Sequence, residues 1–507
     1  MCCLTDNMPL SYFRITAHGA SQAASIPPLA LGPMPSALGR GHKHVHLAMT
    51  DWGKDINLDK IDEERVIQTF LLLPEPGHYE IQVRLLHYNV SHDMISENFQ
   101  MNSKLYNKRP GMWIDQKIRN ARGAIGTKLF IPKHAAEHSR YYTDRQRLPK
   151  CGFEGIGQFG GASHTGTRYG MPLAGRWVYK PPNGDDPLKD YTDLDQRHLV
   201  EHSQWTPYFC QLDHDISYTT ALEKVQWMHF TGDSNTRHMF YYVCELGNGT
   251  LLSVNPDRVP RYLDPPHACI GPSSDDNRPD SVTGLQVGSK ARWVLTYTNW
   301  FWGKKQTLDQ RPETDFGFRT QCQKFVEQNK TGLFYGWPQC ELAPNFIQEM
   351  SGPGLTYFGW GSHAAEFGAN PATSEYFQTE EAFRLPFFYD HPVIFPLTTA
   401  NTPSLIPDKF GKQQVMRNNE RVHASNVHLV DAVLTEYKKY ETRAPGGYTD
   451  PKSIIPIFDL FSPTFAAYEV LACDAVHFDK FFSYEEPKYL MHYIYHAANW
   501  GPKKKSN

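Results

Sequence analysis

The chain has 507 residues, which is too long for one ordinary hydrophobic core, so two domains are expected. Lys and Arg number 51 against 54 Asp and Glu, and the resulting formal charge of −3 argues against a general nucleic-acid or membrane-surface binder. No apolar run approaches the roughly 20 residues that a transmembrane helix needs, so no membrane span is predicted in this chain.

The N-terminal segment is rich in Ala, Pro, Gly and Ser and has little periodicity, which predicts a mostly disordered tail over 1–45. Its apolar patches are broken by Pro and Gly and do not resemble a signal peptide. His42, His44 and His46 alternate near its end and would share one face of an extended segment. With no Cys or carboxylate close by, an exposed strand is the better interpretation, and no metal site is predicted.

A β-rich region follows. The stretch "RVIQTFLLLPEPGHYEIQVRLLHYNV" predicts two strands around a Pro-Gly turn, and the second strand alternates apolar and polar residues. A further strand is predicted in "GTKLFIP" at 126–132. We therefore expect a β-sandwich over 46–148.

The next segment, "CGFEGIGQFGGASHTGTRYG", is Gly-rich and irregular. Gly155, Gly157 and Gly160 satisfy the G-x-G-x-x-G pattern of dinucleotide-binding sites. Such a site needs a hydrophobic strand directly before the glycines and an amphipathic helix after them, and neither is present. A loop without nucleotide is therefore predicted.

The remainder of the chain, 149–507, is predicted to be an α/β domain. Amphipathic helices are expected at 417–439 and 486–498, between and after short apolar segments. Alternation of this kind is typical of a largely parallel sheet. The predicted strands are at 225–230, 292–298, 354–359, 392–396 and 454–459.

One strand-to-helix turn in this domain has the residues of a nucleophile site. "MHFTGDSNTRHM" follows an apolar strand, and the apolar spacing after it predicts a helix. Gly232 permits a sharp bend, and the Ser234 hydroxyl would meet free N–H groups at the positive end of the helix dipole. That position favours an oxyanion. The alternative is that Asp233 or Ser234 merely caps the helix.

A base and an orienting acid for such a serine occur near the other end of the chain. In "LACDAVHF", Asp474 and His477 are separated by two residues, so one turn can place both side chains together. The carboxylate would bond one imidazole nitrogen and leave the other to accept the Ser234 proton. Taken alone, D-x-x-H has little specificity, but after a GDS turn and an α/β pattern it is informative.

With these motifs in order, the chain resembles the SGNH/GDSL hydrolase superfamily, and within it the PC-esterase branch. That branch includes trichome-birefringence-like, sialate O-acetyltransferase and neurexophilin-and-PC-esterase proteins. The motifs are "GRWVY" at 175–179, "WTPYFC" at 205–210, "FTGDSNTR" at 230–237 and "DAVHF" at 474–478. The resemblance implies a three-layer SGNH-hydrolase-like catalytic domain, and the β-rich region before it resembles an immunoglobulin-like domain.

Residue by residue, the resemblance implies that Ser234 is the nucleophile, His477 the general base and Asp474 the acid that orients it. The Ser234 N–H would be one oxyanion donor. "YFGWGSHAAEFG" contains Gly361 and His363 where a second oxyanion block would fall, so they are candidates for a donor or substrate contact, although His363 is equally explained as a structural loop residue. Three further residues are expected to support the nucleophile turn: Gly232, Asp233 and Arg237.

The function implied is a serine-dependent O-acyltransferase that passes acetyl to carbohydrate hydroxyls through an acyl-enzyme. Alternatives are a carbohydrate acetyl-esterase, in which water is the acceptor, and a neurexophilin-like non-catalytic protein that binds glycan or protein. No cofactor is expected beyond an acetyl donor such as acetyl-CoA or an acetyl ester. The expected partner is a carbohydrate or glycoconjugate acceptor.

The resemblance places the chain in the secretory pathway, in the Golgi lumen or outside the cell, although no signal peptide or anchor is visible. Nine Cys are compatible with two or three disulfides, and Cys151 with Cys210 is one candidate pair at the entry to the catalytic domain. Sequons at Asn89, Asn248 and Asn329 permit glycosylation but do not establish it.

Overall fold

A computed structural model provides the structure of the chain. It describes 2–5, 12–24, 64–67, 72–87, 113–117, 127–137, most of 169–253, 267–272, 292–299, 354–359, 393–402 and 455–496, with isolated residues between them.

The larger sheet has eight described strands in the order β12-β13-β14-β11-β15-β16-β17-β8. From β14 to β8 every neighbouring pair is parallel, whereas β12 and β13 add an antiparallel edge. The five strands predicted for this domain are all present. The bounds are β8 Tyr169–Met171, β11 Trp227–Gly232, β12 Thr250–Ser253, β13 His267–Ile270, β14 Val294–Asn299, β15 Leu355–Phe358, β16 Val393–Pro396 and β17 Ile455–Phe458.

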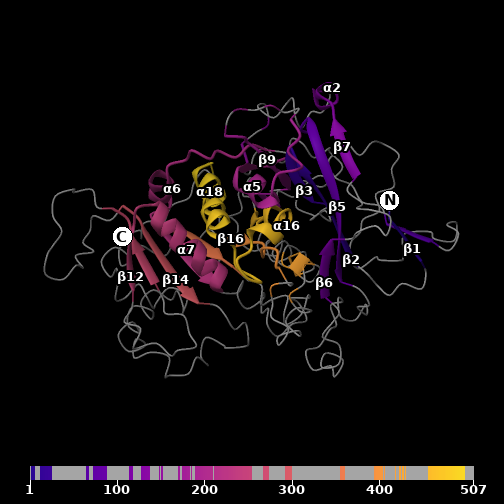
Figure 1. The fold of residues 1–507 in the computed structure, drawn as a ribbon. Helices are drawn as coiled ribbons and strands as arrows, with labels where there is room; N and C mark the ends of the chain where they lie inside the picture. The colour runs from indigo at the N-terminus through magenta and orange to yellow at the C-terminus, as the bar shows by residue number, and fades with distance from the viewer. Residues whose placement is uncertain are drawn as a thin grey trace, which may run out of the picture.

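Helices α6 (Tyr218–Val225), α7 (Ser234–Leu246) and α18 (Lys480–His496) pack around this sheet. α7 contacts β11 and β14, and α18 lies beside both α6 and α7 (Figure 1). The apolar face of α7 is buried as its spacing predicts, and Phe240 packs edge-to-face on Phe230 of β11. This packing holds the start of α7 at the carboxyl end of β11. None of the described helices is long and apolar enough to span a membrane.

A second sheet combines strands from the predicted tail, from the predicted β-sandwich and from the start of the predicted α/β domain. Its order is β10-β9-β3-β2-β5-β6, and β7 also pairs with β5. All of its pairs are antiparallel. The bounds are β2 Tyr12–Gly19, β3 Ser21–Ala24, β5 Gly77–His87, β6 Trp113–Lys117, β7 Thr127–Ile131, β9 Gly175–Tyr179 and β10 Ser203–Pro207. A separate two-stranded sheet pairs β1 (Cys2–Thr5) with β4 (Glu64–Ile67).

This sheet corrects two boundaries. The sequence predicts a disordered tail over 1–45, but β2 and β3 form two neighbouring strands of the sheet. The predicted boundary between 148 and 149 also falls inside one structural unit, because β9 and β10 extend the sheet built by β2, β3 and β5. Strand β2 could not be predicted from composition because three of its buried residues are polar: Arg14, Thr16 and His18. The immunoglobulin-like identity of this region stays a prediction.

The short helices α16 (Phe461–Phe465) and α17 (Tyr468–Leu471) connect the two sheets. Gln22 of β3 donates to the Ala466 carbonyl at 2.9 Å, and the Trp177 indole of β9 donates to the Pro463 carbonyl at 3.0 Å. Arg14 of β2 makes an ion pair with Glu469. The N-terminal strands therefore rest on the segment that leads directly to 474–477.

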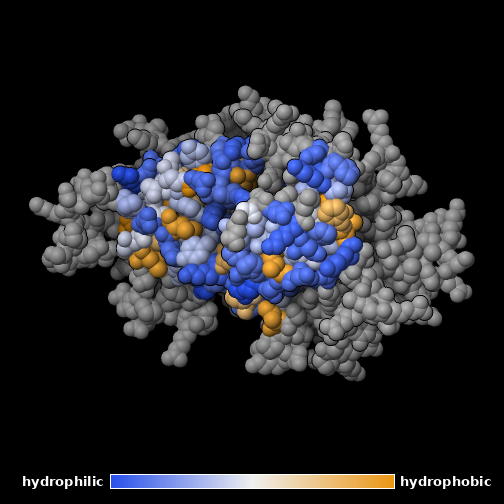
Figure 2. Space-filling model, turned by 45° about the horizontal axis from the view of Figure 1, so that its top comes forward, coloured by the Kyte–Doolittle hydropathy of each residue, from blue (hydrophilic) through white to orange (hydrophobic). Residues whose placement is uncertain are grey.

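Two disulfides fix further parts of the fold. Cys151 pairs with Cys210, which was a candidate pair from the sequence, and Cys244 pairs with Cys269. The second bond ties the end of α7 to β13. On the face drawn in Figure 2, the described surface is mostly hydrophilic, with small separate hydrophobic areas rather than one broad apolar patch.

Candidate active site

The turn that contains the predicted nucleophile lies where β11 ends and α7 begins. Gly232 closes the strand, Asp233 is the helix N-cap, and Ser234 is the first helical residue. A Cβ on Gly232 would lie 2.2 Å from Thr236 Oγ1 and 2.7 Å from the Gly359 carbonyl oxygen. Only glycine allows the chain to turn this closely against α7 and the end of β15.

Two hydrogen-bonding groups hold the turn. The buried Asp233 carboxylate accepts from the Asn235 N–H at 3.0 Å, so the capping role considered for this residue is present. The Tyr297 hydroxyl of β14 reaches the carbonyl oxygens of Gly232 and Asp233 at 3.1 and 3.3 Å. Capping by Asp233 leaves the Ser234 hydroxyl available for another role.

A short loop between α17 and α18 presents the other two side chains. Asp474 Oδ1 accepts from the N–H groups of Val476 and His477, both at 2.8 Å. The loop closes on itself through the Cys473 N–H, which donates to the His477 carbonyl at 3.0 Å, and Thr402 donates its N–H to the Ala475 carbonyl. These bonds fix the backbone that carries both side chains.

The structure brings Ser234, His477 and Asp474 into one hydrogen-bonded chain. His477 Nε2 lies 2.8 Å from Ser234 Oγ, and His477 Nδ1 lies 2.7 Å from Asp474 Oδ2. Since a carboxylate accepts, the Nδ1–H donates to Asp474, and Nε2 is left as acceptor for the serine hydroxyl. The predicted proximity is thus present, and the arrangement can move a proton from Ser234 to His477.

The charge state of Asp474 suits an orienting role. Burial alone would raise its pKa, but hydrogen bonds from the Val476 N–H and from the His477 ring and N–H outweigh that effect, so the pKa lies below its ordinary value. The carboxylate is therefore ionised at neutral pH. It can stabilise the imidazolium that forms when His477 accepts a proton.

Among the described residues, the Ser234 N–H is a candidate oxyanion donor. It lies in the first turn of α7, where N–H groups have no intrahelical partner and the helix dipole favours negative charge. Gly361 and His363, the other predicted contributors, lie outside the described residues. Arg237 sits in the same first turn, with its N–H on the Asp233 carbonyl at 3.0 Å.

Sequence reasoning missed two side chains beside this site. His238 follows Ser234 by one helical turn, and its ring lies 4.9 Å from the His477 ring, centroid to centroid. Glu486 of α18 lies close enough to Asp233 for the two carboxyl groups to interact. The spacing from Ser234 could have revealed His238, whereas nothing local in the sequence places Glu486 near Asp233.

Glu486 carries a testable pH dependence. Burial, and next the negative charge of Asp233, raise the pKa of Glu486 to about 8. Its carboxyl binds a proton more tightly in the folded protein than in the unfolded chain, where its pKa is about 4.3. The stabilisation from this proton is therefore full below about pH 4, and it is lost as the pH rises through 8.

We expect Glu486→Gln to remove this loss, because glutamine keeps the shape and never ionises. The free energy of unfolding should match the wild type near pH 4 and exceed it at pH 8.5, by on the order of 2 kcal/mol since Glu486 as a residue is only partly buried. Urea unfolding across pH measures this difference. Glu223→Gln, at a solvent-exposed ion pair with Arg292, is the control and should show no such trend. Equal pH profiles for Glu486→Gln and the wild type would contradict the assignment.

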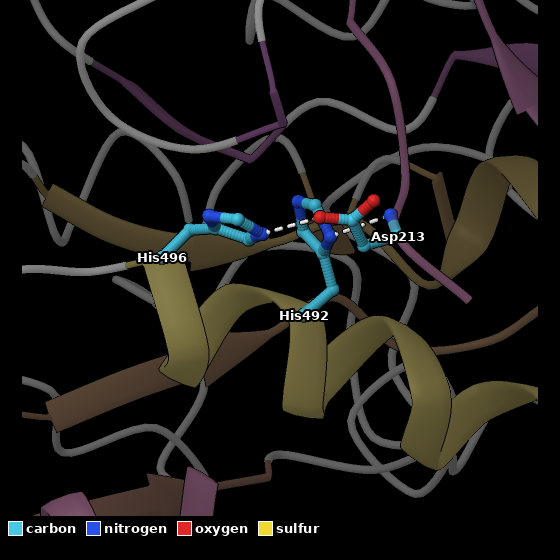
Figure 3. A group of neighbouring side chains, drawn as sticks. All are labelled: Asp213, His492 and His496. Atoms are coloured by element: carbon cyan, nitrogen blue, oxygen red, sulfur yellow. Dashed lines mark hydrogen bonds and ion pairs between the residues drawn. The ribbon is translucent and has the colours of Figure 1, made fainter. Parts of the chain in front are cut away.

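A separate polar cluster contains Asp213, His492 and His496 (Figure 3). The two histidines are one turn apart on α18, and both point toward Asp213 in the loop before α6. One potential ligand atom from each residue lies within 4.8 Å of the others, a grouping that could hold a metal ion.

The hydrogen bonds of the cluster favour a structural tie over a metal site. His492 Nδ1 accepts from the Asp213 N–H at 2.7 Å, and its Nε2 donates to the Cys151 carbonyl at 2.6 Å. Asp213 accepts from the His496 ring at 2.8 Å and from the Lys150 ammonium at 2.6 Å. Both nitrogens of His492 are engaged, and an ammonium group already neutralises the carboxylate. The cluster attaches the end of α18 to the segment beside the Cys151–Cys210 disulfide.

We expect His492→Ala to lower the free energy of unfolding by about 2–4 kcal/mol, because it leaves two backbone polar groups without their partner. His198→Ala, which removes an exposed histidine that also has another histidine one turn later, should cost less than about 0.5 kcal/mol. Added zinc should not raise the melting temperature of the wild type in calorimetry. A zinc-dependent rise that His492→Ala abolishes would establish the cluster as a metal site instead.

Comparison with known proteins gives no further assignment. No protein-family model, curated protein or solved structure matches this chain. The interpretation of the site therefore depends on the arrangement of its own residues, and the SGNH and PC-esterase resemblance stays a prediction drawn from four short motifs.

Proposed function

We propose that this chain is a serine-dependent O-acyltransferase that forms an acyl-enzyme on Ser234. The observation that supports it is the continuous chain of hydrogen bonds from Ser234 Oγ through His477 to Asp474, at 2.8 and 2.7 Å. A serine at the start of a helix, with an imidazole on its hydroxyl and a carboxylate on the imidazole, has the parts that acyl transfer needs.

The reaction would run in two steps. Ser234 Oγ attacks the acyl carbonyl while its proton passes to His477 Nε2, and the leaving group of the donor departs with that proton. An acceptor hydroxyl then attacks the acyl carbon and gives its proton to His477, which returns it to Ser234 Oγ. The Ser234 N–H, at the positive end of α7, would stabilise the oxyanion in both steps.

The acetyl group and the carbohydrate acceptor come from the motif resemblance. We propose acetyl-CoA or an acetyl ester as donor and a hydroxyl of a glycan as acceptor. A secretory location is supported by the two disulfides, Cys151–Cys210 and Cys244–Cys269, because such bonds persist in oxidising compartments.

Hydrolysis is the second candidate, and exposure of the acid–base pair favours it. The Asp474 side chain is 53% exposed and that of His477 is 23% exposed, so water can reach the group that would activate the acceptor. A non-catalytic glycan- or protein-binding protein is the third. Such a binding protein would not require a serine hydroxyl, an imidazole and a carboxylate to be hydrogen-bonded to one another.

The test uses the full chain with a fluorophosphonate probe and with 4-nitrophenyl acetate, in the presence and absence of neutral oligosaccharides. Labelling of Ser234, release of nitrophenol and appearance of acetylated sugar by mass spectrometry are the results expected of a transferase. Nitrophenol release with free acetate as the sole acyl product would identify a hydrolase. A wild-type chain that neither labels nor releases nitrophenol would refute the acyl-enzyme proposal.

A further inference from the structure

One face of α7 continues the candidate active site along the helix. Its opposite face is buried in the core by Thr236, Met239, Phe240, Val243 and Cys244. Among the residues that are not buried, four recur at three- and four-residue spacing and so share one side of the helix: Ser234, His238, Tyr242 and Glu245. Ser234 and Tyr242 are separated by about 12 Å along the helix axis.

A second row of side chains lies on α18, which begins three residues after His477. Lys480 and Tyr484 are one helical turn apart on it. Tyr484 packs edge-to-face on Tyr242 with 4.9 Å between ring centroids, and its hydroxyl donates to Glu245. The Lys480 ammonium lies 5.5 Å from the centre of the Tyr484 ring.

The two rows form one seam, which we define as His238, Tyr242, Glu245, Lys480 and Tyr484. Each of these residues keeps part of its surface exposed. The seam begins at the contact between the His238 and His477 rings and ends at the pair of tyrosines. It is therefore continuous with the side of the site on which His477 lies.

His238 is chemically suited to contact a neutral polar group. Burial, and next the proximity of His477 and Arg237, lower the pKa of His238 to about 4. Its imidazole is neutral at physiological pH, and no described residue hydrogen-bonds to it. It therefore offers one donor and one acceptor nitrogen to a ligand.

The direction of acceptor attack places the acceptor along this seam. In the second step of acyl transfer, the attacking hydroxyl must reach His477 Nε2, because that nitrogen takes its proton. The rest of the acceptor then lies beside the neighbours of His477, and His238 is packed directly against that ring. A longer acceptor would continue toward Tyr242 and Tyr484.

We propose that this seam is a binding subsite for the acceptor, and that the acceptor is an uncharged oligosaccharide. This assignment rests on the proposed acyl transfer at Ser234. A pyranose ring has a C–H face that packs on tyrosine and hydroxyls at its rim that bond to imidazole, carboxylate and ammonium groups. The seam offers these groups, and Lys480 and Glu245 contribute one charge of each sign, which does not favour a charged polymer.

The experiment measures binding in the Ser234→Ala background, so that no turnover occurs. The probes are xylohexaose, cellohexaose and mannohexaose, and dissociation constants come from isothermal titration calorimetry. Tyr242→Ala and Tyr484→Ala are each added to that background. Tyr495→Ala is the matched control, because Tyr495 is also an exposed tyrosine of α18 under a lysine, with Lys224 at 4.1 Å, but lies at the opposite end of the helix.

We expect at least one of these oligosaccharides to bind, and either seam substitution to weaken that binding about tenfold, as loss of one aromatic contact does. Tyr495→Ala should change the dissociation constant less than twofold. Absence of binding by all three probes, or equal binding by the seam variants and the control, overturns the subsite. Failure of the wild type to label with fluorophosphonate, with oligosaccharide binding at the seam intact, would overturn the acyl-enzyme proposal and the acceptor role but leave the seam as a binding site, so the two failures are distinguishable.

Discussion

Ser234→Ala should abolish ester cleavage and acetyl transfer while the protein stays folded. The substitution removes the atom that would attack the acyl carbon, and a triad loses most of its rate enhancement when any member is deleted. We expect kcat to fall by a factor of at least about 10⁴. The fold should lose only on the order of 1 kcal/mol, because Asp233 rather than Ser234 caps α7. Nitrophenyl acetate kinetics and thermal unfolding measure the two quantities.

His477→Ala should produce a similar fall in kcat, and the double variant should be little slower than either single one, because residues that act as a unit are non-additive. Asn235→Ala is the control. Asn235 neighbours the proposed nucleophile, and the substitution retains its N–H, which donates to the Asp233 carboxylate. Unchanged turnover by Ser234→Ala, together with retained labelling, would show that another nucleophile is responsible.

The parallel part of the large sheet could be predicted because its strands are local signals. All of its strands except β8 are short, largely apolar runs of four to six residues, and such runs can be recognised in the sequence whatever they pack against. β8 has only three residues and was not predicted. The candidate triad was predictable for a different reason. Ser234 follows a strand that ends in glycine, and Asp474 lies within one turn of His477. Each part of the candidate triad can therefore be recognised from a short stretch of sequence.

The second sheet could not be predicted in the same way, because its strands depend on distant partners. β2 places Arg14, Thr16 and His18 in the interior. From sequence alone, a polar residue is predicted to be exposed unless its interaction partner is known. Glu75 and Arg176 are likewise buried as a pair that joins residues 101 positions apart. No local sequence pattern indicates that Glu486 approaches Asp233. The raised pKa of Glu486 therefore could not be predicted either.

Arg14 provides the strongest test of how the N-terminal strands support the candidate site. Its side chain is fully buried and donates to both carboxylate oxygens of Glu469 at 2.7 Å and to the Phe465 carbonyl at 2.5 Å. The guanidinium also lies 4.5 Å from the centre of the Tyr468 ring. These contacts hold α16 and α17, and Asp474 follows three residues after α17 ends.

Arg14→Leu should lower the free energy of unfolding by about 3–5 kcal/mol, because it leaves the largely buried Glu469 carboxylate without its positive partner. Arg14→Leu combined with Glu469→Leu should recover much of that loss, since the uncompensated charge is then gone. Arg292→Ala, at the exposed ion pair with Glu223, is the control and should cost at most about 1 kcal/mol. Equilibrium unfolding in urea gives all three values.

The same variants separate support of the site from stability alone. If the N-terminal strands position the loop at 474–477, fluorophosphonate labelling per folded molecule should slow in Arg14→Leu, measured well below its melting temperature. The loop would then sample orientations in which His477 does not contact Ser234. A displacement of about 1 Å between the two groups is enough to slow proton transfer. Slower labelling that the double variant does not restore would show that the Arg14–Glu469 pair itself orients the loop. Unchanged labelling in a destabilised Arg14→Leu protein would instead limit the N-terminal strands to holding the fold together.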